Sequence, residues 1–87
     1  MVKYIHLNEL AAGCRARVVS VGGADAIRQR FEDLGIVRGT EILCVMKSPL
    51  GDPVAYLIRG ALIAIRREDS ANILAELSVE AQDGTYS

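Results

Sequence analysis

The chain has 87 residues, which fits a single domain, and a chain this short buries only about 60% of the surface that its unfolded state exposes. Its residues are 51% hydrophobic, with three tyrosines, one phenylalanine and no tryptophan, so the composition is that of a folded protein with an aliphatic core. The formal net charge is −1 and the ten basic residues are scattered, which argues against nucleic acid as a partner because phosphates are held by a concentrated basic surface.

The uncharged runs of the sequence are too short for a membrane-spanning helix. The longest of them, residues 42–46 and 60–65, fall far short of the roughly 20 apolar residues that such a helix needs. Residues 1–30 also lack the apolar segment of a secretory signal. We therefore expect a cytoplasmic protein that does not insert directly into the membrane.

The first elements along the chain are a helical turn over residues 7–13 and a strand. Asn8 can cap the turn, and Gly13 can end it in the left-handed conformation. Residues 14–21 alternate between apolar side chains and arginines at their start, which is the period of a half-buried strand. The glycine pair that follows ends this strand as a plain turn, because it lacks the third glycine and the lysine of a phosphate-binding loop.

A helix is predicted over residues 25–34, where the period changes. Ile27, Phe31 and Leu34 recur at spacings of four and three and form an apolar stripe on about three turns. Gly35 is expected to end this helix as the left-handed residue of a cap in which Phe31 contacts the residue after the glycine.

Turns rich in glycine and proline separate the strands of the second half. We expect Gly39, Pro49 and Gly60 to form these turns. A short helical turn over residues 68–71, capped by Asp69 or by the serine after it, precedes the final strand. The strands are expected at residues 40–47, 53–59, 62–66 and 73–79.

These elements predict a mainly β fold with five short strands, one helix after the first strand, and short helical turns. Closure into a small five-stranded barrel is the natural arrangement, because it removes the unpaired edges of an antiparallel sheet. The domain is expected to occupy residues 1–80. Residues 81–87 carry no apolar pattern and are expected to form a flexible tail.

A leucine stands in the middle of a turn made of strong turn formers. Ser48, Pro49 and Gly51 fit the first, second and fourth positions of a type I turn, which puts Leu50 at the tip of a hairpin. A side chain at such a tip normally faces water. Leu50 therefore either folds back onto the body of the protein or waits for a partner.

The central strands are apolar on both faces, as in Ile42, Cys44 and Met46 against Leu43 and Val45. One face must line the core. Strands of antiparallel sheets with one solvated face usually alternate between apolar and polar side chains. The second apolar face therefore needs a cover, either the protein's own helix or another molecule.

The sequence contains no recognisable catalytic or metal-binding arrangement. His6 is the single histidine and has no nucleophile near it in the sequence. Cys14 and Cys44 lie in predicted strands and form no Cys-x-x-Cys pair, so we expect buried small hydrophobic residues. The histidine, the two cysteines and the scattered carboxylates are not spaced as the ligands of a metal site would be.

The order and spacing of four pieces are similar to the FeoA family, the small cytosolic proteins of bacterial ferrous iron uptake. The pieces are Asp33-Leu34-Gly35, Gly39-Thr40, Pro49-Leu50-Gly51-Asp52-Pro53 and Arg66-Arg67-Glu68-Asp69. The resemblance covers about residues 7–79. Arg38 stands where the family usually has proline, which leaves the turn in place with slightly less rigidity.

The resemblance implies an SH3-like barrel and a non-catalytic accessory role, namely binding of the cytoplasmic GTPase region of the FeoB ferrous iron transporter. It associates the family with transition metals, which leaves Fe²⁺ or Zn²⁺ binding open without placing ligands. Related barrels occur as C-terminal domains of iron-dependent repressors, so a stand-alone metal-sensing module is the alternative.

The leading hypothesis is an adaptor recruited by the transporter to the inner face of the membrane. Its expected contact is an apolar edge with Leu50 at the tip and the basic helix face nearby. Homodimerisation through the apolar strands is left open, and nucleic acid is not expected as a partner. The candidate partner-binding residues are Arg28, Arg30, Leu50, Gly51, Asp52 and Pro53.

Overall fold

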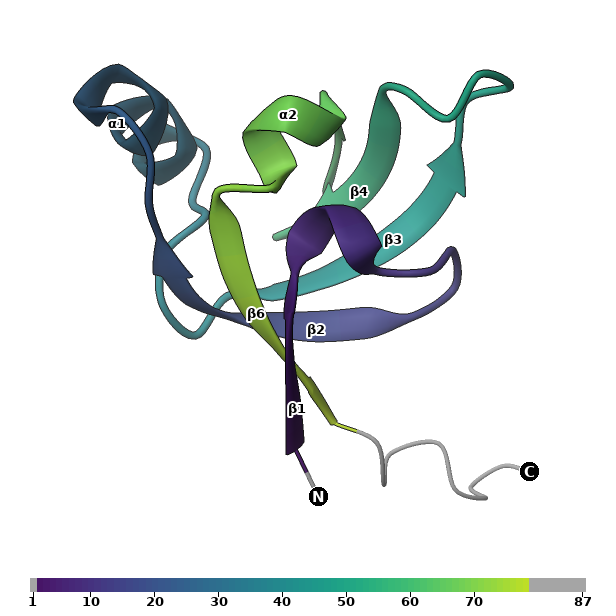
Figure 1. The fold of residues 1–87 in the computed structure, drawn as a ribbon, viewed down its shortest axis with the longest axis horizontal. Coiled ribbons are helices and arrows are strands. Elements are labelled where there is room, and N and C mark those ends of the chain that lie inside the picture. Colours follow the sequence, from purple (N-terminus) through teal and green to yellow (C-terminus); the bar gives the residue numbers. More distant parts are fainter. Residues whose placement is uncertain (1, 79–87) are drawn as a thin grey trace.

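The computed structural model describes residues 2–78 and contains six strands in one antiparallel sheet (Figure 1). The strand order is β1-β6-β2-β3-β4-β5. In chain order the elements are β1 (Val2–His6), the 3₁₀ turn η1 (Leu7–Glu9), β2 (Arg15–Val21), α1 (Asp25–Asp33), β3 (Glu41–Lys47), β4 (Val54–Ile58), β5 (Ala61–Ile65), α2 (Arg67–Ser70) and β6 (Ile73–Ser78).

The strand β1 was missing from the sequence prediction, so there are six strands where five were expected, and α1 follows the second strand. β1 pairs only with β6 within the described residues, with Tyr4 opposite Glu76 and Ile5 opposite Ala75. Ile5 is the one side chain of β1 that is half-buried, and the others are exposed. An edge strand of this kind has little need of apolar alternation, which explains why the pattern did not reveal it.

The strand pairing of the described residues does not close the sheet into the expected barrel. The ladders begin at β1 and end at β5, and between residues 2 and 78 no ladder joins these two strands. Figure 1 shows α1, α2 and η1 in the upper part of the molecule, with α1 to the left of β6 and η1 to its right. The tail expected over residues 81–87 lies outside the described residues.

The core is a single hydrophobic cluster formed by residues of the sheet and of the helical elements. Phe31 and Tyr56 are its largest members, and both are 1% exposed. The Tyr56 hydroxyl donates a hydrogen bond to the carbonyl of Leu7 at 3.3 Å, which attaches η1 to β4. The buried residues are Leu7, Leu10, Ala16, Val18, Phe31, Ile36, Ile42, Cys44, Val54, Tyr56, Ile58, Ile65, Ile73 and Ala75.

The helix α1 ends at Gly35, whose φ of +86° lies in the left-handed region. The Ile36 N–H donates to the Phe31 carbonyl and the Gly35 N–H donates to the Glu32 carbonyl, both at 2.9 Å, which is the Schellman arrangement. Phe31 and Ile36 are buried, whereas Leu34, expected on the apolar stripe, is 37% exposed at the helix end.

The helix α2 begins at Arg67, two residues before the expected cap. The Asp52 carboxylate accepts a hydrogen bond from the Arg67 N–H at 2.9 Å. A carboxylate at this position satisfies one of the free amides of the first helical turn and interacts favourably with the helix dipole. The cap therefore comes from the β3–β4 connection and could not be found by local inspection of residues 68–71.

Candidate interaction surfaces

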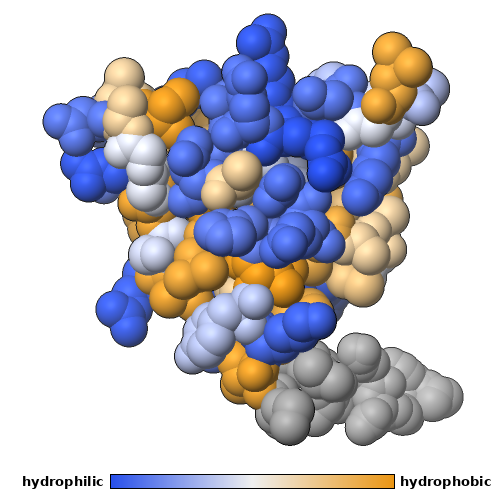
Figure 2. All heavy atoms as spheres, in the orientation of Figure 1, coloured by the Kyte–Doolittle hydropathy of each residue, from blue (hydrophilic) through white to orange (hydrophobic). Residues whose placement is uncertain are grey.

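The β3–β4 connection presents an apolar tip. Leu50 is 94% exposed, which excludes the interpretation that it folds back onto the core. The Gly51 N–H donates to the Ser48 carbonyl at 2.8 Å and closes the four-residue turn, with Pro49 at its second position. Figure 2 shows hydrophobic atoms projecting at the upper right, where Figure 1 places this connection. The tip is therefore held in shape by its backbone while its leucine faces outward.

The next two residues of the connection attach the tip to the rest of the protein. Asp52 caps α2 through the hydrogen bond to Arg67 described above. Pro53 follows in a cis peptide bond, and its carbonyl accepts from the Ser48 N–H at 3.3 Å. Asp52 therefore already has a structural partner, whereas Leu50 is the large apolar side chain of the tip that is open to another molecule.

The two candidate arginines of α1 make ion pairs with acidic neighbours. The Arg28 guanidinium lies 2.7 Å from the Asp25 carboxylate, one helical turn earlier. The Arg30 guanidinium lies 4.0 Å from the Asp69 carboxylate of α2. Asp25 occupies the first position of α1, where a carboxylate interacts favourably with the helix dipole.

The structure does not bring these arginines close to Leu50. Figure 1 places α1 and the β3–β4 connection at opposite sides of the molecule. The expectation that the basic helix face lies near the leucine is therefore wrong. The candidate residues form two areas, which we call the tip (residues 48–53) and the α1 face (Arg28 and Arg30).

A third area is a row of apolar side chains on the outer face of β3, β4 and β5. Leu43 lies opposite Leu57, and Leu57 lies opposite Leu62, so all three share one face of the sheet. Leu43 is half-buried, Leu57 is 39% exposed and Leu62 is 65% exposed. The two-faced apolar pattern thus corresponds to one face in the core and one face that remains partly open to solvent.

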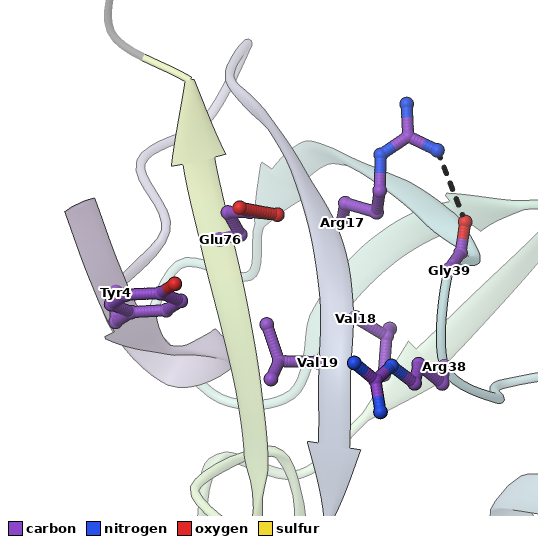
Figure 3. Close-up of a pocket in the computed structure, with 7 residues that line it drawn as sticks. All are labelled: Tyr4, Arg17, Val18, Val19, Arg38, Gly39 and Glu76. Atoms are coloured by element: carbon purple, nitrogen blue, oxygen red, sulfur yellow. Dashed lines mark hydrogen bonds between the residues drawn. The ribbon is translucent and has the colours of Figure 1, made fainter. Parts of the chain in front are cut away.

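A shallow hollow lies on the outer face near the other edge of the sheet (Figure 3). Arg17 of β2 donates a hydrogen bond to the Gly39 carbonyl at 3.2 Å, and Tyr4 and Glu76 stand on the neighbouring strands β1 and β6. Arg38 also lines the hollow, so the residue that departs from the family's usual proline contributes a cation there. Sequence inspection missed this cluster because its members come from four separate segments.

The titratable groups of the core are held in their neutral forms. Burial raises the pKa of the Cys44 thiol, an effect opposed by Lys47. Burial likewise raises the pKa of Tyr56. Neither residue has the lowered pKa of an activated nucleophile. Within residues 2–78 there is also no group of three or more His, Cys, Asp or Glu side chains that could hold a metal ion.

The two cysteines differ in exposure, which corrects the expectation that both are buried. Cys44 is buried in β3, whereas Cys14 precedes β2 and is exposed. We expect one thiol of the native protein to react quickly with a thiol reagent and the second to react at least about 100-fold more slowly, since it must wait for unfolding. A Cys14→Ser variant should lose the fast reaction. Two fast thiols in the native wild type would contradict this assignment.

These surfaces, together with a single small sheet and an aliphatic core, define a β domain that offers areas for binding, with no catalytic cleft among its described residues. The chain belongs to the FeoA domain family, because the FeoA domain matches residues 5–77. This family consists of non-catalytic accessory domains of ferrous iron transport. Within residues 2–78, no helix is long or apolar enough to span a bilayer.

A curated relative joins this domain to a transporter in one chain. It is the Fe(2+) transport protein A/Fe(2+) transporter FeoB fusion protein of Porphyromonas gingivalis, which is 41% identical over 73 residues. The match covers 84% of the present chain and 9% of the fusion protein. The present chain therefore spans only a small part of that relative.

Two solved structures share the fold over most of the chain. The FeoA-like protein of Clostridium acetobutylicum is 35% identical with a TM-score of 0.84, and the alignment covers 99% of this chain and 100% of that one. FeoA of Stenotrophomonas maltophilia, solved as a complex with zinc and described as an SH3 domain protein, is 31% identical with a TM-score of 0.72 and coverages of 82% and 88%. The fold of the chain is therefore SH3-like.

Proposed function

We propose that this protein is a cytoplasmic adaptor that binds the GTPase region of a FeoB-type ferrous iron transporter and modulates it. The observation that carries the proposal is the exposed Leu50 in a hydrogen-bonded turn at the tip of a FeoA domain. An isolated leucine that is 94% exposed gains nothing from the fold and is available to a partner. Recruitment by the transporter would bring the protein to the inner face of the membrane.

The fusion protein supports the choice of partner. Two domains in one chain stay at high effective concentration, so a fusion is useful where they act together. In the separate protein, the same association requires an intermolecular contact, and the tip and the α1 face are our candidates for it. Because these areas lie at opposite sides in Figure 1, we assign the primary contact to the tip and a secondary contact to Arg28 and Arg30.

The substitution Leu50→Ser is expected to weaken binding to the purified GTPase region by about tenfold to hundredfold. A buried leucine contributes about 1.5 to 3 kcal/mol, and each 1.4 kcal/mol is a factor of about ten in affinity. Isothermal titration calorimetry with and without nucleotide measures the change. Val37→Ser is the matched control, because Val37 is 42% exposed and belongs to the connection between α1 and β3 and not to the tip.

Arg28→Glu tests the secondary contact in the same titration. A smaller loss, together with a binding affinity that depends more weakly on salt, is expected for an exposed charge at the rim of an interface. If Leu50→Ser and Arg28→Glu both bind like the wild type while remaining folded, the tip and the α1 face are not the contact.

The alternative of a metal-sensing module has no ligand set within the described residues. A stable transition-metal site needs three or four converging donors, and residues 2–78 hold no such group. The zinc in the relative's structure belongs to that protein.

A further inference from the structure

The strand β5 is an unprotected edge of the sheet. Within the described part of the chain it pairs only with β4, in a regular register from Ala61 to Ile65. Proteins usually guard such an edge with a charge, a proline or a bulge. β5 has the sequence Ala-Leu-Ile-Ala-Ile, which contains none of these, whereas the opposite edge β1 carries Lys3. An edge of this kind is a template for another strand.

The hairpin geometry shows which backbone groups of β5 are available. Arg59 and Gly60 form a two-residue loop with φ values of 51° and 85°, as in a type I′ turn. In such a hairpin the residues flanking the loop exchange hydrogen bonds, and the next pair does not. Leu62 and Ala64 therefore direct their N–H and C=O groups away from β4, toward the open edge.

The side chains beside this edge favour an apolar strand. Leu62 is 65% exposed, Ala64 is exposed, and both lie on the outer face with Leu57. A strand added to β5 would place alternate side chains against this row. The apolar contact would come from the row and the hydrogen bonds from Leu62 and Ala64.

The charges at the two ends of β5 have the same sign. Arg59 precedes the strand, with its side-chain stem against Gly35, and Arg66 follows the strand; both residues are exposed. We propose that the β5 edge binds an extended partner segment with an apolar centre and acidic residues at both ends. Main-chain hydrogen bonds to Leu62 and Ala64 would hold the segment, and the two arginines would select its ends.

The same charges argue against a second copy of this chain as the occupant. If two β5 strands paired antiparallel about their centres, Arg59 of one copy would lie beside Arg66 of the other at both ends of the pair. Like charges at both ends oppose this pairing. The proposal concerns a surface separate from the tip and does not depend on the transporter being the partner.

A synthetic peptide with a Val-Ile-Val centre and two aspartates at each end is the probe, and hydrogen exchange measured by NMR is the readout. Saturating peptide should slow exchange of the Leu62 and Ala64 amides by at least about tenfold, because they become hydrogen-bonded. The same peptide with lysines in place of the aspartates should bind at least about tenfold more weakly. Equal binding of the two peptides would overturn the role of the arginines.

Ala64→Pro removes one outward donor and leaves the β4–β5 hydrogen bonds in place, since proline is tolerated where an edge N–H faces solvent. This substitution should lower the affinity of the protein for the aspartate peptide by at least about tenfold. Leu62→Lys gives the same test if the proline variant unfolds, and Val2→Lys on β1, where Val2 is 47% exposed, is the control. Wild-type binding by a folded Ala64→Pro variant would overturn the proposal. So would a wild-type dimer in sedimentation that Ala64→Pro dissociates, since a second copy would then occupy the edge.

Discussion

Phe31→Ala is expected to lower the free energy of unfolding by about 3 to 5 kcal/mol. Phe31 is the single phenylalanine of the chain and the buried residue through which α1 joins the core. Small domains have a total stability of about 5 to 15 kcal/mol, so this change removes a large part of it. A fall of at least about 12 °C in Tm should follow in thermal unfolding followed by circular dichroism.

Leu34→Ala provides the control for this prediction. Leu34 belongs to the same apolar stripe but is 37% exposed at the end of α1. The Leu34→Ala substitution should lower the free energy of unfolding by about 1 kcal/mol or less. If Phe31→Ala proved as mild as Leu34→Ala, the packing of α1 on the sheet would be wrong.

Thr40→Val is expected to lower the free energy of unfolding by about 2 to 3 kcal/mol, although threonine and valine side chains have the same shape. The Thr40 hydroxyl donates to the Gly35 carbonyl at 2.9 Å and accepts from the Val37 N–H at 3.2 Å, and the residue is 8% exposed. Valine leaves both backbone groups without this partner. Urea unfolding gives the change in free energy.

Thr40→Ser separates the hydroxyl from the methyl group. Serine keeps both hydrogen bonds and loses one methyl, so it should cost about 1 kcal/mol. Thr40→Val should therefore be the more harmful of the two variants. The reverse order would mean that the methyl group, and not the hydroxyl, stabilises the connection between α1 and β3.

Elements with strong local signals were predictable from the sequence. The helix and its glycine follow from the spacing of apolar residues and from the need for a left-handed residue, and the structure has φ of +86° at Gly35. The central strands follow from apolar runs between turn residues, and each of their ends in the structure lies within one residue of the expected position.

Features that depend on distant parts of the chain were not predictable. β1 exists because β6 offers it a partner, and no local pattern required it. The cap of α2 comes from Asp52, 15 residues before the amide that it binds. The separation of Arg28 from Leu50 likewise depends on how the sheet places α1 and the hairpin, which sequence spacing does not specify.

The cap of α2 has a mechanical consequence for the two candidate contact areas. Asp52 belongs to the tip and holds the first amide of α2, while Asp69, two residues further along this helix, faces Arg30 of α1. The four-residue helix α2 therefore contacts both the β3–β4 loop and α1, which lie at opposite sides of the molecule. A ligand that shifts the loop away from α2 must break the hydrogen bond between Asp52 and Arg67, so α2 is the element that both candidate areas contact.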